Sequence, residues 1–133
     1  MINYLIDTNI CIYILNRKPK SVLDRFESFS TEKICISSIT IAELEIGAKK
    51  SKRRKENLER LELFLFPFEI LPFNGNSAKF YGDIRSKLEL KGHVIGQLDM
   101  LIAAQALENN LVLVTNNQKE FSRISNLKLE NWI

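Results

Sequence analysis

Three acidic residues lie where the sequence pattern places the ends of strands and the starts of helices. Asp7 follows a short apolar run, Glu43 comes early in the segment after Lys33–Ser37, and Asp99 begins an apolar, alanine-rich segment. Bringing three carboxylates together is costly unless a cation lies between them. Mg²⁺ and Mn²⁺ prefer oxygen ligands and keep water ligands that substrate phosphates can replace. The pattern therefore predicts metal-assisted hydrolysis of phosphodiester bonds.

Each of these residues also has a purely structural interpretation. Asp7 and Asp99 suit the N-cap of a helix, and Thr40-x-x-Glu43 fits a capping box. Asn116 and Asn117, which follow another apolar run, are ordinary turn residues. The metal site is favoured because all of these positions fall at one predicted edge of a sheet.

That edge depends on the elements that the apolar periodicity predicts. The predicted strands are Met1–Ile6, Lys33–Ser37, Phe68–Leu71, Leu111–Val114 and Leu127–Leu129. The predicted helices are Ile10–Leu15, Ser21–Phe29, Ser38–Ala48, Asn57–Leu65, Asn76–Leu90 with Gly92 as its stop, Asp99–Leu107 and a short one around Phe121. This alternation predicts one α/β domain over residues 1–133, with a mostly parallel central sheet flanked by helices. In such sheets the ligand crevice lies beyond the carboxyl ends of the strands.

Composition narrows the class of protein. The chain has 133 residues, 45% of them hydrophobic and 26% charged, which is typical of one globular domain. Its net charge of +3 is too small to indicate a nucleic-acid partner by itself. No apolar run approaches the ~18 residues of a membrane span, and no leader pattern precedes the first strand. Cys11 and Cys35 lack metal-ligand spacing, so we expect buried, reduced thiols and a cytoplasmic protein.

A basic run is the strongest local charge feature. Six of the seven residues from Lys49 to Lys55 are cations. Such a run forms either a solvated helix end or a contact with a phosphate backbone. The candidate RNA-binding residues are Lys49, Lys50, Lys52, Arg53 and Arg54. His93, the sole histidine, is expected in a loop without a chemical role.

Taken together, four segments resemble PIN-domain ribonucleases of the VapC toxin type. These segments are Leu5-Ile6-Asp7-Thr8-Asn9, Ile36-Ser37-Ser38-Ile39-Thr40-Ile41-Ala42-Glu43-Leu44, Asp99-Met100-Leu101-Ile102-Ala103-Ala104, and Leu113-Val114-Thr115-Asn116-Asn117 followed by Glu120-Phe121. The similarity runs from end to end and includes Tyr81-Gly82-x-Ile84-Arg85 and the closing Leu129-Glu130-Asn131-Trp132.

The resemblance implies a Mg²⁺-dependent endoribonuclease of a type II toxin–antitoxin pair, with Mn²⁺ as a substitute ion. It implies a VapB-like antitoxin whose tail crosses the acidic pocket and inserts a basic side chain. It also implies a toxin homodimer, larger complexes that bind operator DNA through the antitoxin, and an RNA substrate, with initiator tRNA as one candidate.

The resemblance assigns roles residue by residue. Asp7, Glu43 and Asp99 match the acidic metal-site positions. Many relatives have Asp where this chain has Asn117, so either Asn117 or Glu120 is expected to supply the remaining catalytic oxygen. The residues expected to orient the substrate or the acids are Thr8, Asn9, Thr115 and Asn116.

Three rival classes fit less well. A phosphatase of the haloacid dehalogenase type needs a second Asp where Asn9 stands, and a receiver domain needs an Asp after Phe68–Leu71, where Pro72-Phe73-Asn74 follows. The remaining alternative is a PIN-like module that binds RNA or protein without cleaving it. The three intact acids argue against that alternative.

Overall fold

The computed structural model describes residues 2–133, and it contains one five-stranded sheet in which every neighbouring pair of strands is parallel. The strand order is β3-β2-β1-β4-β5. The strands are β1 (Tyr4–Ile6), β2 (Ile34–Ser37), β3 (Glu69–Leu71), β4 (Val112–Val114) and β5 (Lys128–Glu130). This confirms the predicted α/β class with a parallel sheet. Met1, the first residue of the first predicted strand, lies outside the described residues.

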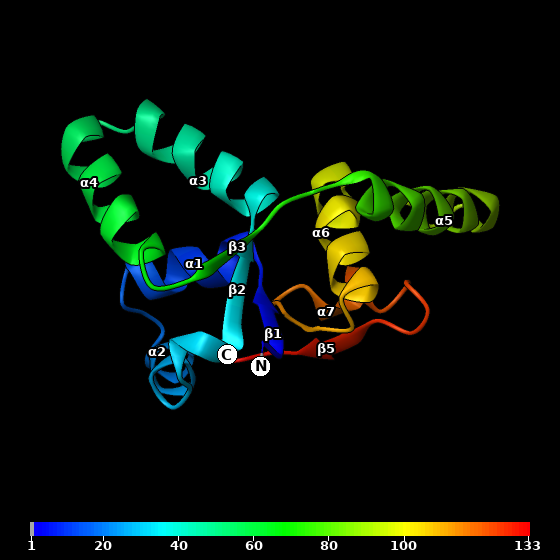
Figure 1. The fold of residues 1–133 in the computed structure, drawn as a ribbon, viewed down its shortest axis with the longest axis horizontal. Helices are drawn as coiled ribbons and strands as arrows, with labels where there is room; N and C mark the ends of the chain where they lie inside the picture. The colour runs from blue at the N-terminus through cyan, green and yellow to red at the C-terminus, as the bar shows by residue number, and fades with distance from the viewer. Residues whose placement is uncertain (1) are drawn as a thin grey trace.

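Helices cover both faces of this sheet (Figure 1). They are α1 (Thr8–Leu15), α2 (Lys20–Glu27), α3 (Ser38–Lys50), α4 (Arg54–Leu65), α5 (Gly75–Lys91), α6 (Gln97–Glu108) and α7 (Gln118–Phe121), with a 3₁₀ turn at Thr31–Lys33. Helices α3 and α4 form one arm of the molecule, and α5 packs along α6 on the other side (Figure 1).

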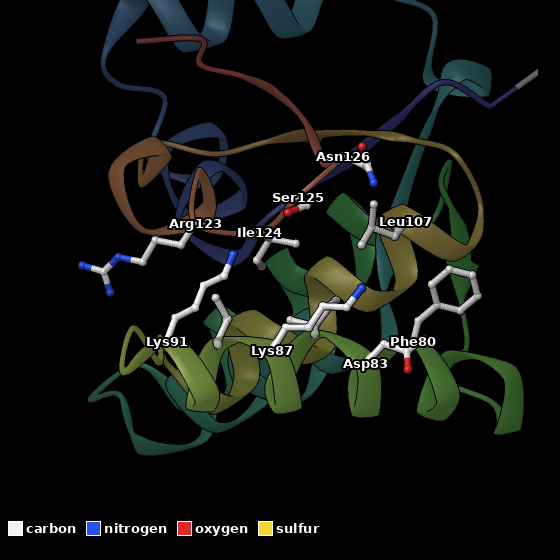
Figure 2. Close-up of a pocket in the computed structure, with 11 residues that line it drawn as sticks. Phe80, Asp83, Lys87, Lys91, Leu107, Arg123, Ile124, Ser125 and Asn126 are labelled. Atoms are coloured by element: carbon white, nitrogen blue, oxygen red, sulfur yellow. The ribbon is translucent and has the colours of Figure 1, made fainter.

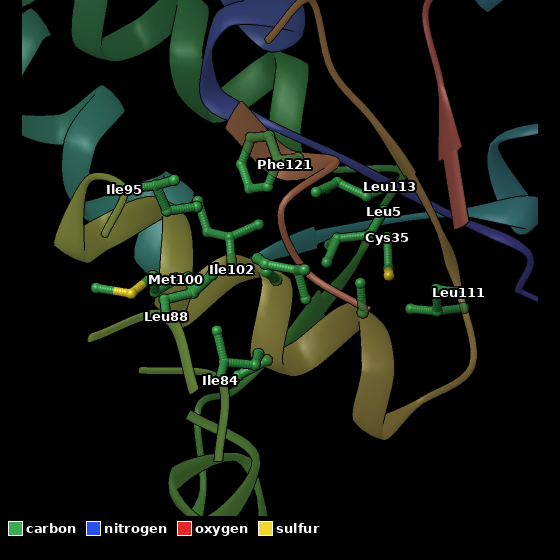
Figure 3. Close-up of a cluster of buried hydrophobic side chains, with 14 residues drawn as sticks. Leu5, Cys35, Ile84, Leu88, Ile95, Met100, Ile102, Leu111, Leu113 and Phe121 are labelled. Atoms are coloured by element: carbon green, nitrogen blue, oxygen red, sulfur yellow. The ribbon is translucent and has the colours of Figure 1, made fainter. Parts of the chain in front are cut away.

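The two faces are set by the alternation of side chains along each strand. On β1, Leu5 belongs to a core cluster with Ile84, Leu88 and Ile102 from α5 and α6, which Figure 3 shows together with Phe121 of α7. The next residue, Ile6, belongs to a second cluster. That cluster contains residues of α1, α2, α3 and α4: Ile10, Cys11, Ile14, Val22, Leu44 and Leu61.

The residues that cap α3 and α6 differ from those that the sequence suggested, although α3 begins at Ser38 as predicted. Helix α3 is capped by the Ser37 hydroxyl, which accepts a hydrogen bond from the Ile39 backbone N–H at 2.9 Å. The capping box between Thr40 and Glu43, the structural alternative to metal binding by Glu43, is therefore wrong, because both residues lie inside the helix. Helix α6 likewise begins at Gln97 with Gly96 as its N-cap, so Asp99 does not cap it. Gly92 ends α5 in the left-handed conformation, φ 68°, as predicted.

The topology gives the carboxyl edge of the sheet a switch point between β1 and β4. From β1 the chain builds outward through β2 and β3, whereas β4 and β5 lie on the other side. In open parallel sheets ligands bind in the crevice at such a point. The Asp7 backbone N–H donates to the carbonyl of Val114 at 3.0 Å, so the first residue after β1 lies beside the end of β4.

Two further sequence predictions can be compared with the structure. Cys11 and Cys35 are both buried and free, as predicted. Across residues 2–133, no helix is long and apolar enough to span a membrane.

Candidate active site

Asp7 lies at the centre of the carboxyl edge and is almost completely buried, with 5% of its surface exposed. It caps α1, since its Oδ1 accepts a hydrogen bond from the Ile10 backbone N–H at 3.0 Å. The pKa of Asp7 is raised to about 6, mainly by burial and in smaller part by the negative charges of Asp99 and Glu43. The Thr115 hydroxyl and the Ile10 N–H oppose this rise but do not cancel it. A buried carboxylate beside two others is a site that a cation would stabilise.

Glu43 faces Asp7 from the second turn of α3 and is fixed by a contact across two helices. The Thr8 hydroxyl, in the first turn of α1, donates to Glu43 Oε1 at 2.6 Å. The same hydroxyl lies 3.2 Å from the hydroxyl of Thr40, which is fully buried one turn before Glu43. The capping interpretation of Asp7 is thus correct, and it coexists with a position facing the other acids. The contact also makes Thr8 the residue that orients Glu43.

Asp99 completes the group from the first turn of α6. Its pKa is raised by partial burial first, then by the charges of Glu43 and Glu120. Gly96 leaves room for this carboxylate, because an added Cβ at Gly96 would lie only 3.2 Å from Asp99 Oδ2. Asp7, Glu43 and Asp99 therefore come from three separate elements and interact electrostatically at one edge, as the sequence pattern predicted.

The group is open rather than closed around an ion. Within the described part of the chain, no three Asp, Glu, His or Cys side chains are close enough together to hold a metal ion in this conformation. The chemistry of the donor set nevertheless fits Mg²⁺ or Mn²⁺: it consists of carboxylate oxygens whose mutual repulsion a divalent cation relieves. Mg²⁺ usually keeps several waters, so it does not need direct ligation by every acid.

The residues after β4 divide between the site and the surface. Thr115 is fully buried and lowers the pKa of Asp7, and its hydroxyl also accepts a hydrogen bond from the Asn117 backbone N–H at 2.9 Å. Asn116 is exposed, and its amide donates to the Tyr13 hydroxyl at 3.2 Å. Glu120, in α7, is close enough to raise the pKa of Asp99, and Asn117 lies at the N-cap of the same helix. Asn9 is exposed in the first turn of α1.

The basic run lies away from this centre. Lys49 and Lys50 end α3, Arg54 begins α4, and seven residues of helix, about 10 Å, separate Lys50 from Glu43. All five candidate RNA-binding residues, Lys49, Lys50, Lys52, Arg53 and Arg54, are exposed. Two of them form surface ion pairs, Lys49 with Glu45 and Arg53 with Glu56, each at 3.7 Å. The structure thus places the run at the turn between α3 and α4, outside the acidic group.

Sequence reasoning missed a buried glutamine that joins the elements carrying the acids. Gln105 of α6 is fully buried, accepts a hydrogen bond from the Ser37 hydroxyl, and donates to the carbonyl of Leu71 at 3.0 Å. It therefore links α6, which carries Asp99, to the start of α3, which carries Glu43. The only signal in the sequence was a polar residue inside an alanine-rich run.

A parallel α/β sheet with converging acids at its carboxyl edge fits a nuclease domain, and comparison with known proteins identifies the family. The PIN domain family matches residues 4–127. Ribonuclease VapC2 of Rickettsia felis is 47% identical over 130 residues, 97% of each chain. The tRNA(fMet)-specific endonuclease VapC of Shigella flexneri is 39% identical over 132 residues, 99% of each chain.

A solved structure agrees with both matches. The crystal structure of VapBC2 from Rickettsia felis, bound to a DNA fragment from its promoter, contains a chain that superimposes with a TM-score of 0.92 at 46% identity and full coverage of both chains. The protein belongs to the PIN domain family and, within it, to the VapC ribonucleases.

Proposed function

We propose that this chain is a Mg²⁺-dependent endoribonuclease toxin, held inactive by a VapB-like antitoxin, with Mn²⁺ able to replace Mg²⁺. The observation that carries the proposal is the convergence of Asp7, Glu43 and Asp99 at the switch point of the sheet, with the pKa of Asp7 raised to about 6. Such a group has little structural benefit without a cation, because burial and mutual repulsion both oppose its charge.

Asp7, Glu43 and Asp99 would hold the ion. When bound, Mg²⁺ supplies a more acidic water and polarises the phosphoryl oxygen that is attacked. Thr8 keeps Glu43 pointed at the centre through its 2.6 Å hydrogen bond. Thr115, directly after the neighbouring strand β4, orients Asp7 through its hydroxyl. Glu120 is near enough to raise the pKa of Asp99, which supports it as a source of a further oxygen, with Asn117 as the alternative.

The proposed substrate is RNA, and tRNA is the class of RNA that we propose first. The Shigella flexneri relative is named for cleavage of tRNA(fMet), which makes initiator tRNA the first candidate here. The proposed location is the cytoplasm, where this substrate is found.

A groove next to the acids supports the antitoxin as partner. It has a volume of about 270 Å³, lies between α1, α3 and α4, and is lined mainly by apolar side chains, among them Ile12, Leu44 and Leu61. Glu43 lies at its edge, so a peptide in the groove can reach the acidic centre with a basic side chain. The related Rickettsia felis structure is a VapBC complex on promoter DNA. We propose the same kind of assembly here, with DNA contacted through the antitoxin.

The remaining partner is a second copy of the chain. Leu90, Val94 and Leu98 are exposed apolar side chains around the connection between α5 and α6. They offer a surface for the proposed homodimer.

Cleavage of an end-labelled tRNA mixture tests the proposal. We expect discrete products with Mg²⁺ or Mn²⁺, none with EDTA, and none from Asp7→Asn or Asp99→Asn. Asp24→Asn, which neutralises an exposed acid on α2, is the matched control and should cleave normally. Cleavage that persists in EDTA or in both site variants contradicts the proposal. RNA binding by the wild type without cleavage would favour the non-catalytic module instead.

A further inference from the structure

A second concave site lies apart from the acidic group, none of whose residues lines it. It has a volume of about 290 Å³ and lies between α5, the end of α6 and the loop from α7 to β5. This volume is near the lower end of the about 300–1,000 Å³ found for small-molecule sites. Its floor is apolar and includes Ile84, Leu88 and Ile124, and Phe80 lies at one end. None of the residues singled out in the sequence for chemistry lines it.

The rim of this pocket is cationic. Lys87 and Lys91 lie one turn apart on α5 and extend across the pocket toward the α7–β5 loop, while the Arg123 guanidinium points outward from the opposite rim (Figure 2). Asp83 is the only acid among the lining residues. The ion pairs found in residues 2–133 include none to Lys87, Lys91 or Arg123. Like charges one helical turn apart repel each other, so an anion between them would be stabilising.

The pocket is connected to the acidic group through α7. The Arg123 backbone N–H donates to the carbonyl of Glu120 at 3.1 Å, so one turn of chain separates the cationic rim from the acid that acts on Asp99. Arg123 Nη1 also lies 3.5 Å from the carbonyl of Val94, in the loop that leads to α6. A polyanion that enters the acidic centre would therefore meet positive charge on leaving it across α7.

We propose that this pocket, called the α5–α7 pocket below, binds a nucleotide of the RNA that flanks the cleaved bond. The phosphate would lie against Lys87 and Lys91, and the base would stack on Phe80 over the apolar floor. Cations beside an aromatic platform are the common means of holding single-stranded RNA. An acidic peptide would use the cations but would leave the floor and Phe80 without a role. The proposal rests on the proposed endoribonuclease function.

RNA binding without cleavage tests the α5–α7 pocket separately from the chemistry. The background is Asp7→Asn, and the probe is a fluorescein-labelled single-stranded 12-mer RNA, titrated by anisotropy over a range of salt concentrations. We expect Lys87→Gln with Lys91→Gln to weaken binding about tenfold. We also expect this pair to reduce the slope of log Kd against log salt by about 1.4, because each phosphate that a lysine neutralises on a single strand contributes ~0.7.

The matched control removes the same charge elsewhere. Lys20→Gln with Lys33→Gln changes two exposed lysines, one at the start of α2 and one directly before β2, and should change neither Kd nor slope. Phe80→Leu, which keeps an apolar side chain, should weaken binding at least fivefold without changing the slope, because stacking is independent of salt. Thermal unfolding confirms that each variant folds.

Three outcomes would overturn the proposal. The pocket variants could bind RNA as tightly as the control, the control could lose as much affinity as the lysine pair, or polyglutamate could displace RNA as well as unlabelled RNA does. The cleavage assay tests the proposed function separately. If the wild type never cleaves RNA yet binds it through Lys87, Lys91 and Phe80, the nuclease proposal is refuted and the RNA-binding pocket still stands.

Discussion

Because the pKa of Asp7 is raised, the charge of this one side chain affects the free energy of unfolding and can be measured through it. Its carboxyl has a pKa of about 6 in the folded protein against 3.8 for an unperturbed Asp, mainly because of burial. The folded state therefore holds the proton more tightly than the unfolded state does. The stabilisation that comes from protonated Asp7 is fully present below about pH 4, and it is lost as the pH rises through about 6. At neutral pH the charged Asp7 destabilises the metal-free protein.

We expect Asp7→Asn to stabilise the metal-free protein at pH 7.5 by on the order of 2 kcal/mol, and to have little effect at pH 4. Asn caps helices as well as Asp, so the hydrogen bond to Ile10 is preserved. Urea unfolding of both proteins at the two pH values, in EDTA, measures the difference. A variant that is less stable than the wild type at pH 7.5 would show that the buried charge is already compensated.

Thr8 provides the second test at the residue scale. Thr8→Val keeps the shape of the side chain but removes the hydroxyl that holds Glu43 at 2.6 Å. Residues that orient metal ligands typically affect metal affinity 10–100-fold. We expect a similar rise in the Mg²⁺ concentration needed for half-maximal cleavage, with the maximal rate largely recovered at saturation. Thr8→Ser retains the hydroxyl and is the control. An unchanged Mg²⁺ requirement in Thr8→Val would mean that Glu43 needs no such support.

The positions and contacts of the residues at the site were predictable from the sequence to different degrees. Asp7, Glu43 and Asp99 each follow or begin an apolar segment, so their positions follow from the alternation of strands and helices. Gln105 was not predictable, because its partners Ser37 and Leu71 are 68 and 34 residues away. The contact of Thr8 with Glu43 was also hidden, because it joins two helices separated by 35 residues.

At the scale of elements, apolar periodicity predicted which segments form strands and helices, and local polar contacts decided where they begin. Helix α3 begins at Ser38 as predicted, but the Ser37 hydroxyl caps it by accepting a hydrogen bond from the Ile39 N–H, although Thr40 and Glu43 have the spacing of a capping box. The start of α4 at Arg54 was missed because its first turn is charged and has no apolar stripe. Sequence patterns of this kind fix the period of an element more reliably than its ends.

Substitution of a glycine on α3 tests whether the groove between α1, α3 and α4 binds the antitoxin. Gly47 lies on α3 in the groove proposed for the antitoxin, and a Cβ there would meet no atom within 4 Å. We expect Gly47→Phe to fill the groove, to leave RNA cleavage unchanged, and to weaken neutralisation by the antitoxin at least tenfold. The helix itself should not suffer, since Gly is the poorest helix former after Pro.

Gly82→Phe is the matched control for this prediction. Gly82 is also a helical glycine with no atom within 4 Å of an added Cβ, but it lies on α5. Cleavage by each variant is measured while a VapB-like antitoxin is titrated in. Equal inhibition of Gly47→Phe and Gly82→Phe would remove the groove from the proposed interface.

At the scale of the whole molecule, the acidic centre joins two halves of the fold. Glu43 comes from α3, whose Leu44 packs in one core cluster, whereas Asp99 comes from α6, whose Ile102 packs in the other cluster across the sheet. Asp7 lies between the two, directly after β1 and as the N-cap of α1. A divalent ion held by these acids would therefore bind the two layers to each other as well as prepare the site for RNA.

This arrangement predicts that metal removal destabilises the fold. Mg²⁺ at 100 times its Kd should stabilise the wild type by about 2.7 kcal/mol, which for a domain of this size corresponds to a rise in Tm on the order of 10 °C. Thermal unfolding in EDTA and in increasing Mg²⁺ measures the shift. Asp7→Asn, already relieved of its buried charge, should start at a higher Tm and gain much less from Mg²⁺. NaCl at matched ionic strength controls for screening, and an equal Mg²⁺ shift in both proteins would contradict an ion bound between Asp7, Glu43 and Asp99.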